Sequence, residues 1–332
     1  MSLLITILFY VAAAILLFAF EEGYFAIARR YGIVDKPNAR SSHSRVTLRG
    51  GGVIFYIAAL MYFVVSDFSY PLFMAGLTIV AVISFIDDIH SVANRLRALL
   101  QFAALALMFW QLGMTGDLPW WGVIIGLVVA TGIVNAYNFM DGINGITGMY
   151  SLAILVPVWV ENRTLEFVDP RLIVLSAIGV GVFLFYNFRN RARCFAGDVG
   201  SVSIAYIMLF LVGALVVATG QLYYLLFFAV YGADSILTIV HRMMLHENIF
   251  KPHRKHAYQL LANELHWSHR SVSALYGALQ LAISFGLIYW PGNRWLYFCG
   301  VIALLLAAYV IFKRKYYHLH AEYLARQAAS AQ

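Results

Sequence analysis

Charged residues are scarce in this chain of 332 residues: Asp, Glu, Lys and Arg make up 12% of it, whereas soluble domains carry about 25%. Only two cysteines are present, Cys194 and Cys299. They fall in a predicted loop and a predicted membrane span, so we expect no structural disulfide. These shortages exclude a soluble globular protein and a disulfide-stabilised secreted domain. What the chain has instead is 62% hydrophobic residues, in long runs that recur from one end to the other.

The apolar runs predict an all-α, polytopic integral membrane protein with ten to eleven transmembrane helices, because a helix needs about 20 residues to cross a bilayer. We interpret residues 1–332 as a single transmembrane domain with cytoplasmic loops at 21–49, 87–95, 188–199 and 241–270. The expected spans are roughly 3–20, 50–66, 70–86, 96–112, 120–137, 143–160, 171–187, 200–219, 222–240, 271–289 and 295–312.

The basic residues indicate how the chain is oriented. With these spans, twenty of the twenty-three Lys and Arg fall on one side, and all ten histidines join them. Lys and Arg are retained on the cytoplasmic side of a membrane, so we expect a periplasmic amino terminus and a cytoplasmic carboxyl terminus. The net charge of +7 then reflects short loops that face anionic lipid or phosphate, and no nucleic-acid partner is predicted.

Two adjacent carboxylates, Asp87 and Asp88, stand where an apolar run meets the cytoplasmic side. Ionisable groups at such a depth are costly to bury, and two together repel each other unless a cation or a proton intervenes. A divalent cation is the simplest solution. An ordinary solvated helix end is the alternative.

A second polar stretch runs from Asn135 to Gly145. Its residues Asn135, Asn138 and Asp141 are spaced three apart, hence broadly on one helical face. Three glycines follow at the same spacing and would allow close approach of a backbone or a ligand: Gly142, Gly145 and Gly148. Small-residue helix packing is the alternative, and it accounts for the glycines but not for the polar residues.

A lone carboxylate, Asp198, lies between glycines just before another apolar run and follows three arginines. Mg²⁺ prefers oxygen ligands and often takes only one or two carboxylates together with substrate phosphates. Asp198 has the surroundings for this role, although an aspartate at a helix start can also be a simple cap.

Two further segments combine charge with depth or density. Asp234 lies inside a predicted span and needs a partner, for which Arg242 or a neighbouring helix are the options.

The 251–259 segment of the longest loop packs four or five potential cations into six positions, which suits a diphosphate or a nucleotide. A merely positive-inside loop is the alternative. An earlier loop with His43 and Arg49 runs into three glycines, a pattern that only weakly indicates a phosphate site.

Taken in order, these motifs resemble the polyprenyl-phosphate N-acetylhexosamine-1-phosphate transferase superfamily, of glycosyltransferase family 4 type. The resemblance spans about residues 32–260. It implies a multi-pass enzyme of the bacterial inner membrane with a cytoplasmic active site, a Mg²⁺ cofactor for which Mn²⁺ can substitute, and a UDP-N-acetylhexosamine and undecaprenyl phosphate as substrates. Membrane lipids are the other expected partners, and a homodimer is left open.

The resemblance also implies roles for individual residues. Asp198 is the expected metal ligand, with Asp88 beside it. The positions expected to be catalytic are Asp87, Asp88, Asn138 and Asp141. Those expected to bind substrate are His43, Arg49, Arg97, Asn135, Asn144, Asp234, Arg242, His253, Arg254, Lys255 and His256.

Two departures from the family pattern bear on the sugar. Asn144 stands where many members have a second acid, and the wording from His256 to Gln259 replaces a His-x-His-His run. The sequence of this loop is more similar to that of the branch that initiates O-antigen and lipopolysaccharide synthesis with deoxy-N-acetylhexosamines. N-acetylglucosamine remains an alternative sugar. The rival from another class is a secondary transporter or lipid flippase, for which Asp234 is the one supporting feature.

Overall fold

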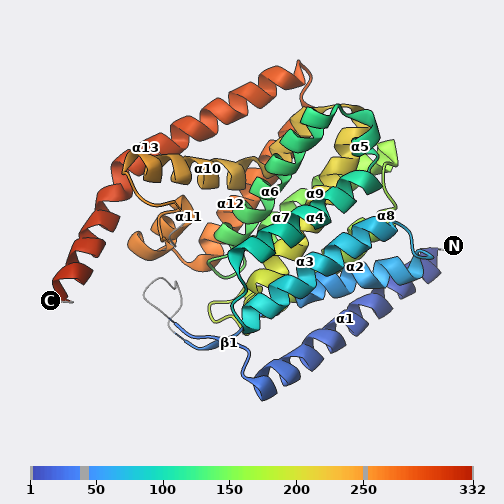
Figure 1. Ribbon diagram of the computed structural model, residues 1–332, viewed down its shortest axis with the longest axis horizontal. Coiled ribbons are helices and arrows are strands. Elements are labelled where there is room, and N and C mark those ends of the chain that lie inside the picture. Colours follow the sequence, from blue (N-terminus) through green and yellow to red (C-terminus); the bar gives the residue numbers. More distant parts are fainter. Residues whose placement is uncertain (1–2, 38–44, 250–252, 331–332) are drawn as a thin grey trace.

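A computed structural model describes residues 3–37, 45–249 and 253–330, and the side chains up to Tyr323. Most of this part is helical (Figure 1). The long helices are α1 (Leu3–Tyr31), α2 (Val53–Val65), α3 (Pro71–Ile89), α4 (Asn94–Gln111), α6 (Trp120–Met140), α7 (Ile146–Leu165), α8 (Pro170–Asn187), α9 (Gly197–Thr219), α10 (Ala229–Met244), α12 (His269–Tyr289) and α13 (Arg294–Ser330). The short elements are β1 (Val34–Asp35), β2 (Thr47–Leu48), α5 (Met114–Asp117), the 3-10 helix η1 (Leu222–Phe228), α11 (Ala257–Gln259) and the π-helix η2 (Leu260–Glu264).

Within the described residues, eight helical segments are long and apolar enough to cross a membrane, with η1 and α10 counted as one. Each of the eleven predicted spans nonetheless coincides with a helix. Among the helices outside the eight, α2 is apolar but has only 13 residues. The all-α, multi-pass character of the chain is thus confirmed, while the number of spans and the side on which each terminus lies stay predictions.

Helix α9 forms the centre of the bundle. Its sequence is apolar all round, with no polar face along most of its length, and from Val199 to Leu215 every residue except Gly213 is buried. A helix of this kind must be surrounded by others, and α9 packs against α2, α3, α6 and α7. By contrast, few or none of the residues in the apolar parts of α1 and α13 are buried, and these helices run along opposite edges in Figure 1. Their exposed residues are the natural contact with lipid.

The chain segments that enter α2 and α9 are joined through their backbones. Strands β1 and β2 pair antiparallel. The amide of Phe195 donates to the carbonyl of Leu48 (2.8 Å), and the amides of Gly51 and Gly52 donate to the carbonyls of Phe195 (2.9 Å) and Ala196 (3.0 Å). Because these bonds hold the starts of both helices together, whatever α9 presents at its first turn has a fixed position relative to residues 48–52.

A glycine pair makes this junction possible. A Cβ atom at Gly52 would lie 2.3 Å from the Cα of Gly200, and one at Gly200 would lie 2.6 Å from the Cα of Gly52. Both distances are shorter than any real Cβ contact, and the neighbouring atoms are backbone. Any larger residue at either position must therefore push the two helices apart.

We expect Gly52→Ala to lower the free energy of unfolding by about 1–3 kcal/mol, the usual range for overpacking a tight contact. The measurement is thermal unfolding of the purified protein in detergent. The matched control is Gly181→Ala in α8, where an added Cβ meets nothing within 4 Å and helix propensity favours alanine. Equal stability of the two variants would contradict the close contact.

Candidate active site

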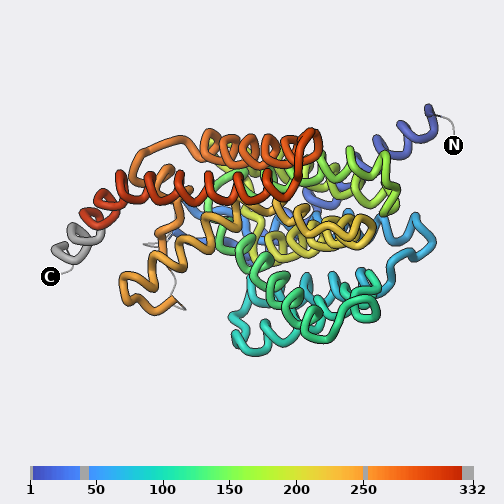
Figure 2. The backbone as a smooth tube through the Cα atoms, turned by 90° about the horizontal axis from the view of Figure 1, so that it is seen from above, coloured from blue at the N-terminus to red at the C-terminus, as the bar shows by residue number. Residues whose placement is uncertain are grey.

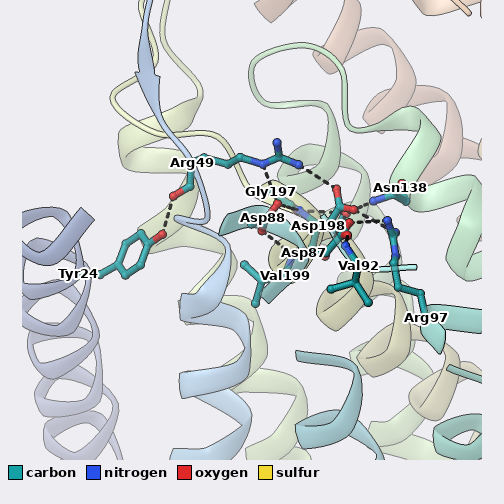
Figure 3. A network of polar contacts seen from close by, with 11 residues as sticks. Tyr24, Arg49, Asp87, Asp88, Val92, Arg97, Asn138, Gly197, Asp198 and Val199 are labelled. Atoms are coloured by element: carbon teal, nitrogen blue, oxygen red, sulfur yellow. Dashed lines mark hydrogen bonds and ion pairs between the residues drawn. The ribbon is translucent and has the colours of Figure 1, made fainter. Parts of the chain in front are cut away.

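Three predicted carboxylates meet at one end of the bundle (Figure 3). Asp87 and Asp88 occupy the last turn of α3, and Asp198 occupies the first turn of α9. Arg49, just after β2, and Arg97, in the first turn of α4, reach them from opposite sides. We call these five residues the aspartate–arginine cluster.

Asp88 anchors the start of α9. Its Oδ1 accepts the backbone N–H of Asp198 (2.9 Å), its Oδ2 accepts that of Val199 (3.0 Å), and Nε of Arg49 donates to Oδ1 (2.6 Å). A negative charge at this place satisfies helix donors that have no partner inside α9 and favours the positive end of the helix dipole. The carboxylate is completely buried, so the alternative of a solvated helix end is wrong for Asp88.

Gly197 makes room for this anchor. Its φ is +72°, a backbone conformation that residues with an L side chain rarely adopt. A Cβ there would also lie 2.5 Å from Oδ2 of Asp88. The glycine before Asp198 is therefore required by the carboxylate that binds the helix start.

The two other carboxylates share one arginine. Arg97 forms ion pairs with Asp87 through Nη1 and with Asp198 through Nη2 (3.0 Å), while Nη2 of Arg49 lies 3.4 Å from the other oxygen of Asp198. Asp87 also accepts the backbone N–H of Val92 (2.7 Å). Of the three carboxylates Asp198 is the most exposed, at 19%, against 11% for Asp87. Because α9 is already capped by Asp88, the carboxylate of Asp198 is not needed as a helix cap.

The second polar stretch supplies Asn138 and Asp141 near the cluster. Nδ2 of Asn138 donates to Oγ of Ser201 in α9 (3.0 Å). Asn135 instead donates to the carbonyl of Thr131 on its own helix (2.9 Å). The predicted shared face of α6 therefore brings Asn138 into contact with α9, whereas the amide of Asn135 is used within α6.

Asp141 follows the end of α6 and has an altered acidity. Oγ1 of Thr147 donates to its Oδ1 (2.5 Å). Burial raises the pKa of Asp141 to about 7, and the negative charges of Asp198 and Asp88 act in the same direction. A carboxyl group that titrates near neutrality beside two charged carboxylates is typical of functional sites.

The glycines of this stretch are in close contact with side chains from other elements. A Cβ atom at Gly142, Gly145 or Gly148 would lie 2.2–2.6 Å from Tyr258, Phe188 or Leu184, respectively. Close packing of protein against protein thus accounts for the three glycines, as the alternative interpretation held.

Asn144 forms hydrogen bonds that join two loops and a helix. It is buried, its Nδ2 donates to the carbonyl of Arg189 (2.8 Å), and its own carbonyl accepts the hydroxyl of Ser273 in α12 (2.8 Å). These contacts join the 141–145 loop to the 188–196 loop and to α12. The prediction that Asn144 binds substrate is untested, and its side-chain amide is engaged in this joint.

Asp234 finds its partner in neighbouring elements rather than in Arg242. Its carboxylate accepts the backbone N–H of Ala257 (2.8 Å) and the hydroxyl of Tyr276 (2.7 Å), and it lies 3.4 Å from Nδ1 of His256. Arg242 pairs with Glu247 (3.1 Å). Asp234 is buried in this network, which connects α10 with α11 and α12.

The positive charges of the basic segment in the longest loop are largely neutralised by acidic side chains of the protein itself. Arg254 pairs with Glu264 (3.1 Å), Lys255 pairs with Glu247, and His256 faces Asp234. Burial lowers the pKa of His253 to about 3, with the nearby positive groups acting in the same direction. His253 is therefore neutral at pH 7, and its predicted contact with substrate stays a prediction. His43 lies outside the described residues.

Sequence reasoning missed several residues that organise these sites. The hydroxyl of Tyr24 donates to the carbonyl of Arg49 (2.5 Å), and that of Tyr258 donates to the carbonyl of Phe139 (3.0 Å). Tyr276 on Asp234 is a third example. A tyrosine in an apolar run carries no local signal of its partner. Ser201, by contrast, lies in the same glycine-flanked stretch as Asp198 and could have been singled out there.

The residues present fit a magnesium ion that is completed by substrate. Among the described residues, no group of three or more His, Cys, Asp or Glu could hold a metal unaided. Mg²⁺ does not need one, because one or two carboxylates together with phosphate oxygens suffice. Asp198 and Asp87 are the partly exposed carboxylates of the cluster. Both oxygens of Asp88, the other expected ligand, are already hydrogen-bonded to the start of α9.

We expect Asp141→Asn to make stability less dependent on pH between about 4 and 7. Because the pKa of Asp141 rises from 3.8 to about 7 on folding, the folded protein keeps a proton here that the unfolded chain releases. The free energy of unfolding therefore falls as pH rises through this window, and asparagine removes that decline. Unfolding midpoints at about pH 5 and about pH 8 test this, with the exposed Asp117→Asn as control. An equal decline in all three proteins would refute the assignment.

Comparison with known proteins agrees with the motifs. Residues 70–232 match the family model described as glycosyl transferase family 4. A phospho-N-acetylmuramoyl-pentapeptide-transferase of Thermotoga neapolitana is 28% identical over 256 residues, which cover 70% of this chain and 81% of the relative.

Two other relatives are named undecaprenyl-phosphate alpha-N-acetylglucosaminyl 1-phosphate transferases. The one from Thermotoga maritima is 25% identical over 76% of this chain and 80% of the relative. The one from Escherichia coli K12 is 24% identical over 79% of this chain and 78% of the relative. With the family match, these relatives bear out the resemblance carried by the motifs: the chain is similar to the polyprenyl-phosphate N-acetylhexosamine-1-phosphate transferase superfamily, of glycosyl transferase family 4 type.

Proposed function

We propose that this membrane protein transfers an N-acetylhexosamine-1-phosphate from a UDP-sugar to undecaprenyl phosphate and releases UMP. The observation that carries the proposal is the aspartate–arginine cluster, in which two guanidiniums and three carboxylates from distant parts of the chain meet at one end of the bundle. The relatives named as undecaprenyl-phosphate transferases support the acceptor and the class of reaction. We place the reaction at the cytoplasmic face of a bacterial inner membrane, where the basic loops gather.

The chemistry asks little of the protein beyond position and charge. An oxygen of the lipid phosphate attacks the sugar-bearing phosphorus, the P–O bond to the uridine phosphate breaks, and UMP leaves. Catalysis of such a transfer is almost entirely positioning and electrostatic stabilisation. A phosphate monoester has its second pKa near 6, so the lipid phosphate is largely dianionic at pH 7 and no strong base is required.

The cluster supplies these needs as follows. Arg49 and Arg97 present guanidiniums, which are suited to hold phosphate oxygens in two-pronged hydrogen bonds. Asp87 holds Arg97 in place through their ion pair. Mg²⁺ at Asp198 would neutralise charge on the diphosphate. Asn138 and Ser201 fix the end of α6 against the first turns of α9, so that the groups around Asp198 keep their geometry.

For the sugar we propose a deoxy-N-acetylhexosamine or N-acetylglucosamine, and for the pathway the initiation of O-antigen or a related lipid-linked surface polysaccharide. The support is the amino-acid sequence of the last basic loop. Tyr258, which stands in the place of a family histidine, is buried against Gly142 and bonds to the end of α6. The one feature that favoured a transporter, Asp234, is engaged at the start of α11 and so needs no transported ion as partner.

We expect purified protein to transfer label from a UDP-N-acetylhexosamine to undecaprenyl phosphate with Mg²⁺ present and to lose the activity in EDTA. Asp198→Asn should lower kcat by at least about a hundredfold, the scale seen when one group that stabilises transition-state charge is removed. Asp117→Asn, far from the cluster in α5, serves as control. Absence of transfer from every donor in the panel would overturn the proposal in favour of the transport hypothesis.

A separate variant decides the role of Asp87. If Asp87 positions Arg97, Asp87→Asn should retain more than about a tenth of the wild-type kcat, because a general base contributes about 10²–10⁴-fold. The measurement is kcat at saturating donor and acceptor. A loss of a thousandfold or more would show that Asp87 is an essential base or nucleophile.

A further inference from the structure

One face of α13, in the part that follows its apolar stretch, is lined by polar and aromatic side chains. They recur at intervals of three or four residues, which places them on the same side of a helix: Tyr309, Lys313, Tyr317, His320 and Tyr323. Figure 1 shows α13 passing α10 and then running beside α11, and in Figure 2 the part of α13 drawn in red follows one side of the bundle. Helix α13 contacts α10, α11 and η2. We call this set of five residues the α13 face.

The first part of the α13 face, Tyr309 to Tyr317, binds the backbone of the basic segment at Lys255. Nζ of Lys313, which is buried, donates to the carbonyl of Lys255. The ammonium of Lys313 lies 5.5 Å from the ring centre of Tyr317, and that of Lys255 lies 5.8 Å from the same ring. The hydroxyl of Tyr309 shares a hydrogen bond of 2.8 Å with Thr238, which donates to Asp234. This part of α13 therefore contacts both the basic segment and the network around Asp234.

The second part of the α13 face, His320 and Tyr323, holds Arg254 through Glu264 and through the ring of Tyr323. Nδ1 of His320 lies 2.8 Å from Oε1 of Glu264, and the same oxygen accepts Nη2 of Arg254 (3.1 Å). The guanidinium of Arg254 lies 4.4 Å from the ring centre of Tyr323. His320 is 2% exposed and the side chain of Glu264 is 5% exposed. A buried carboxylate with these partners is costly to leave alone, so His320 and Arg254 depend on each other through Glu264.

The far side of the same segment is attached to the catalytic end of the bundle. The hydroxyl of Tyr258 donates to the carbonyl of Phe139, one residue after Asn138, and its ring fills the space over Gly142, next to Asp141. Residues 253–264 are thus held between the α13 face and the end of α6.

We propose that the α13 face positions the donor-binding segment, and that Arg254 acts through its attachment to Glu264, His320 and Tyr323 rather than by direct contact with the diphosphate. His320 is then a positioning residue for the UDP-sugar site. The inference rests on the proposed function, because it concerns how that reaction's donor is held. It replaces the expectation that Arg254 and Lys255 are free cations awaiting phosphate.

A double-mutant cycle tests the proposal. We expect His320→Ala and Arg254→Ala each to raise KM for the UDP-sugar by about tenfold, the scale of a lost hydrogen bond to a charged group. KM for the lipid acceptor and kcat should stay within about threefold of wild type. Because both variants break the same attachment, the double variant should be no worse than the more severe single variant. Full additivity would overturn the proposal, as would an unchanged KM in His320→Ala.

Two matched variants separate positioning from a general loss of structure. His318→Ala changes an exposed histidine of the same helix and should leave every kinetic constant unchanged. His320→Gln keeps a donor for Glu264 and should recover most of the loss. If the wild-type protein used no donor at all, the proposed function would fail, and the attachment would still be judged by trypsin. Faster cleavage after Arg254 and Lys255 in His320→Ala than in His318→Ala supports the attachment, and equal rates overturn it.

Discussion

The arrangement of the site depends on one interaction, the contact of the Asp88 carboxylate with the first turn of α9. Two successive backbone amides donate to its two oxygens, and Arg49 supplies the compensating charge. The contact joins the end of α3 to the start of the most deeply buried helix. Since Asp198 is itself one of the two residues whose amides are bound, its carboxylate is fixed in position by its own backbone. Asp87, the neighbour of Asp88, is fixed at the other side of the contact.

The same solution occurs a second time. Asp234 accepts the amides of Ala257 and Tyr258 at the start of α11, as Asp88 accepts those of Asp198 and Val199. In both cases a carboxylate of one helix, at the end of α3 or in the first half of α10, replaces the missing partners at the beginning of another helix. A membrane bundle contains little water to satisfy such groups, so these two aspartates connect elements that lie far apart in the chain. The result is a set of loops that are rigidly placed at one end of the helices.

Much of this could be predicted from the sequence, because hydropathy and charge are local properties. The apolar runs predicted a helix at each expected place, and the order of the motifs predicted the similarity to glycosyl transferase family 4. Asp87, Asp88, Asp198, Arg49 and Arg97, separated by as many as 149 residues, do meet. A local sequence pattern does not show which partner a polar side chain will bind. Asn135 and Asn138 look equivalent on one face, yet one bonds within α6 and the other reaches α9.

The basic segment shows why the rest was out of reach. Density of positive charge indicated a phosphate site, but the carboxylates that neutralise it, Glu247 and Glu264, lie outside the motif, and His320 is some 60 residues further along the chain. Only the fold brings them together. Burial has a similar effect on His253, which no spacing rule could identify as neutral.

Asn144 gives the joint between two loops a property that an acid could not give it. Its amide donates to the carbonyl of Arg189 in any solution in which the protein is folded, because an amide does not titrate. A carboxyl group at the same place could make that bond only while it carried its proton, and once ionised it would face the carbonyl oxygen with like charge. The departure from the family's second acid therefore makes this corner of the protein indifferent to the acidity of the surrounding solution.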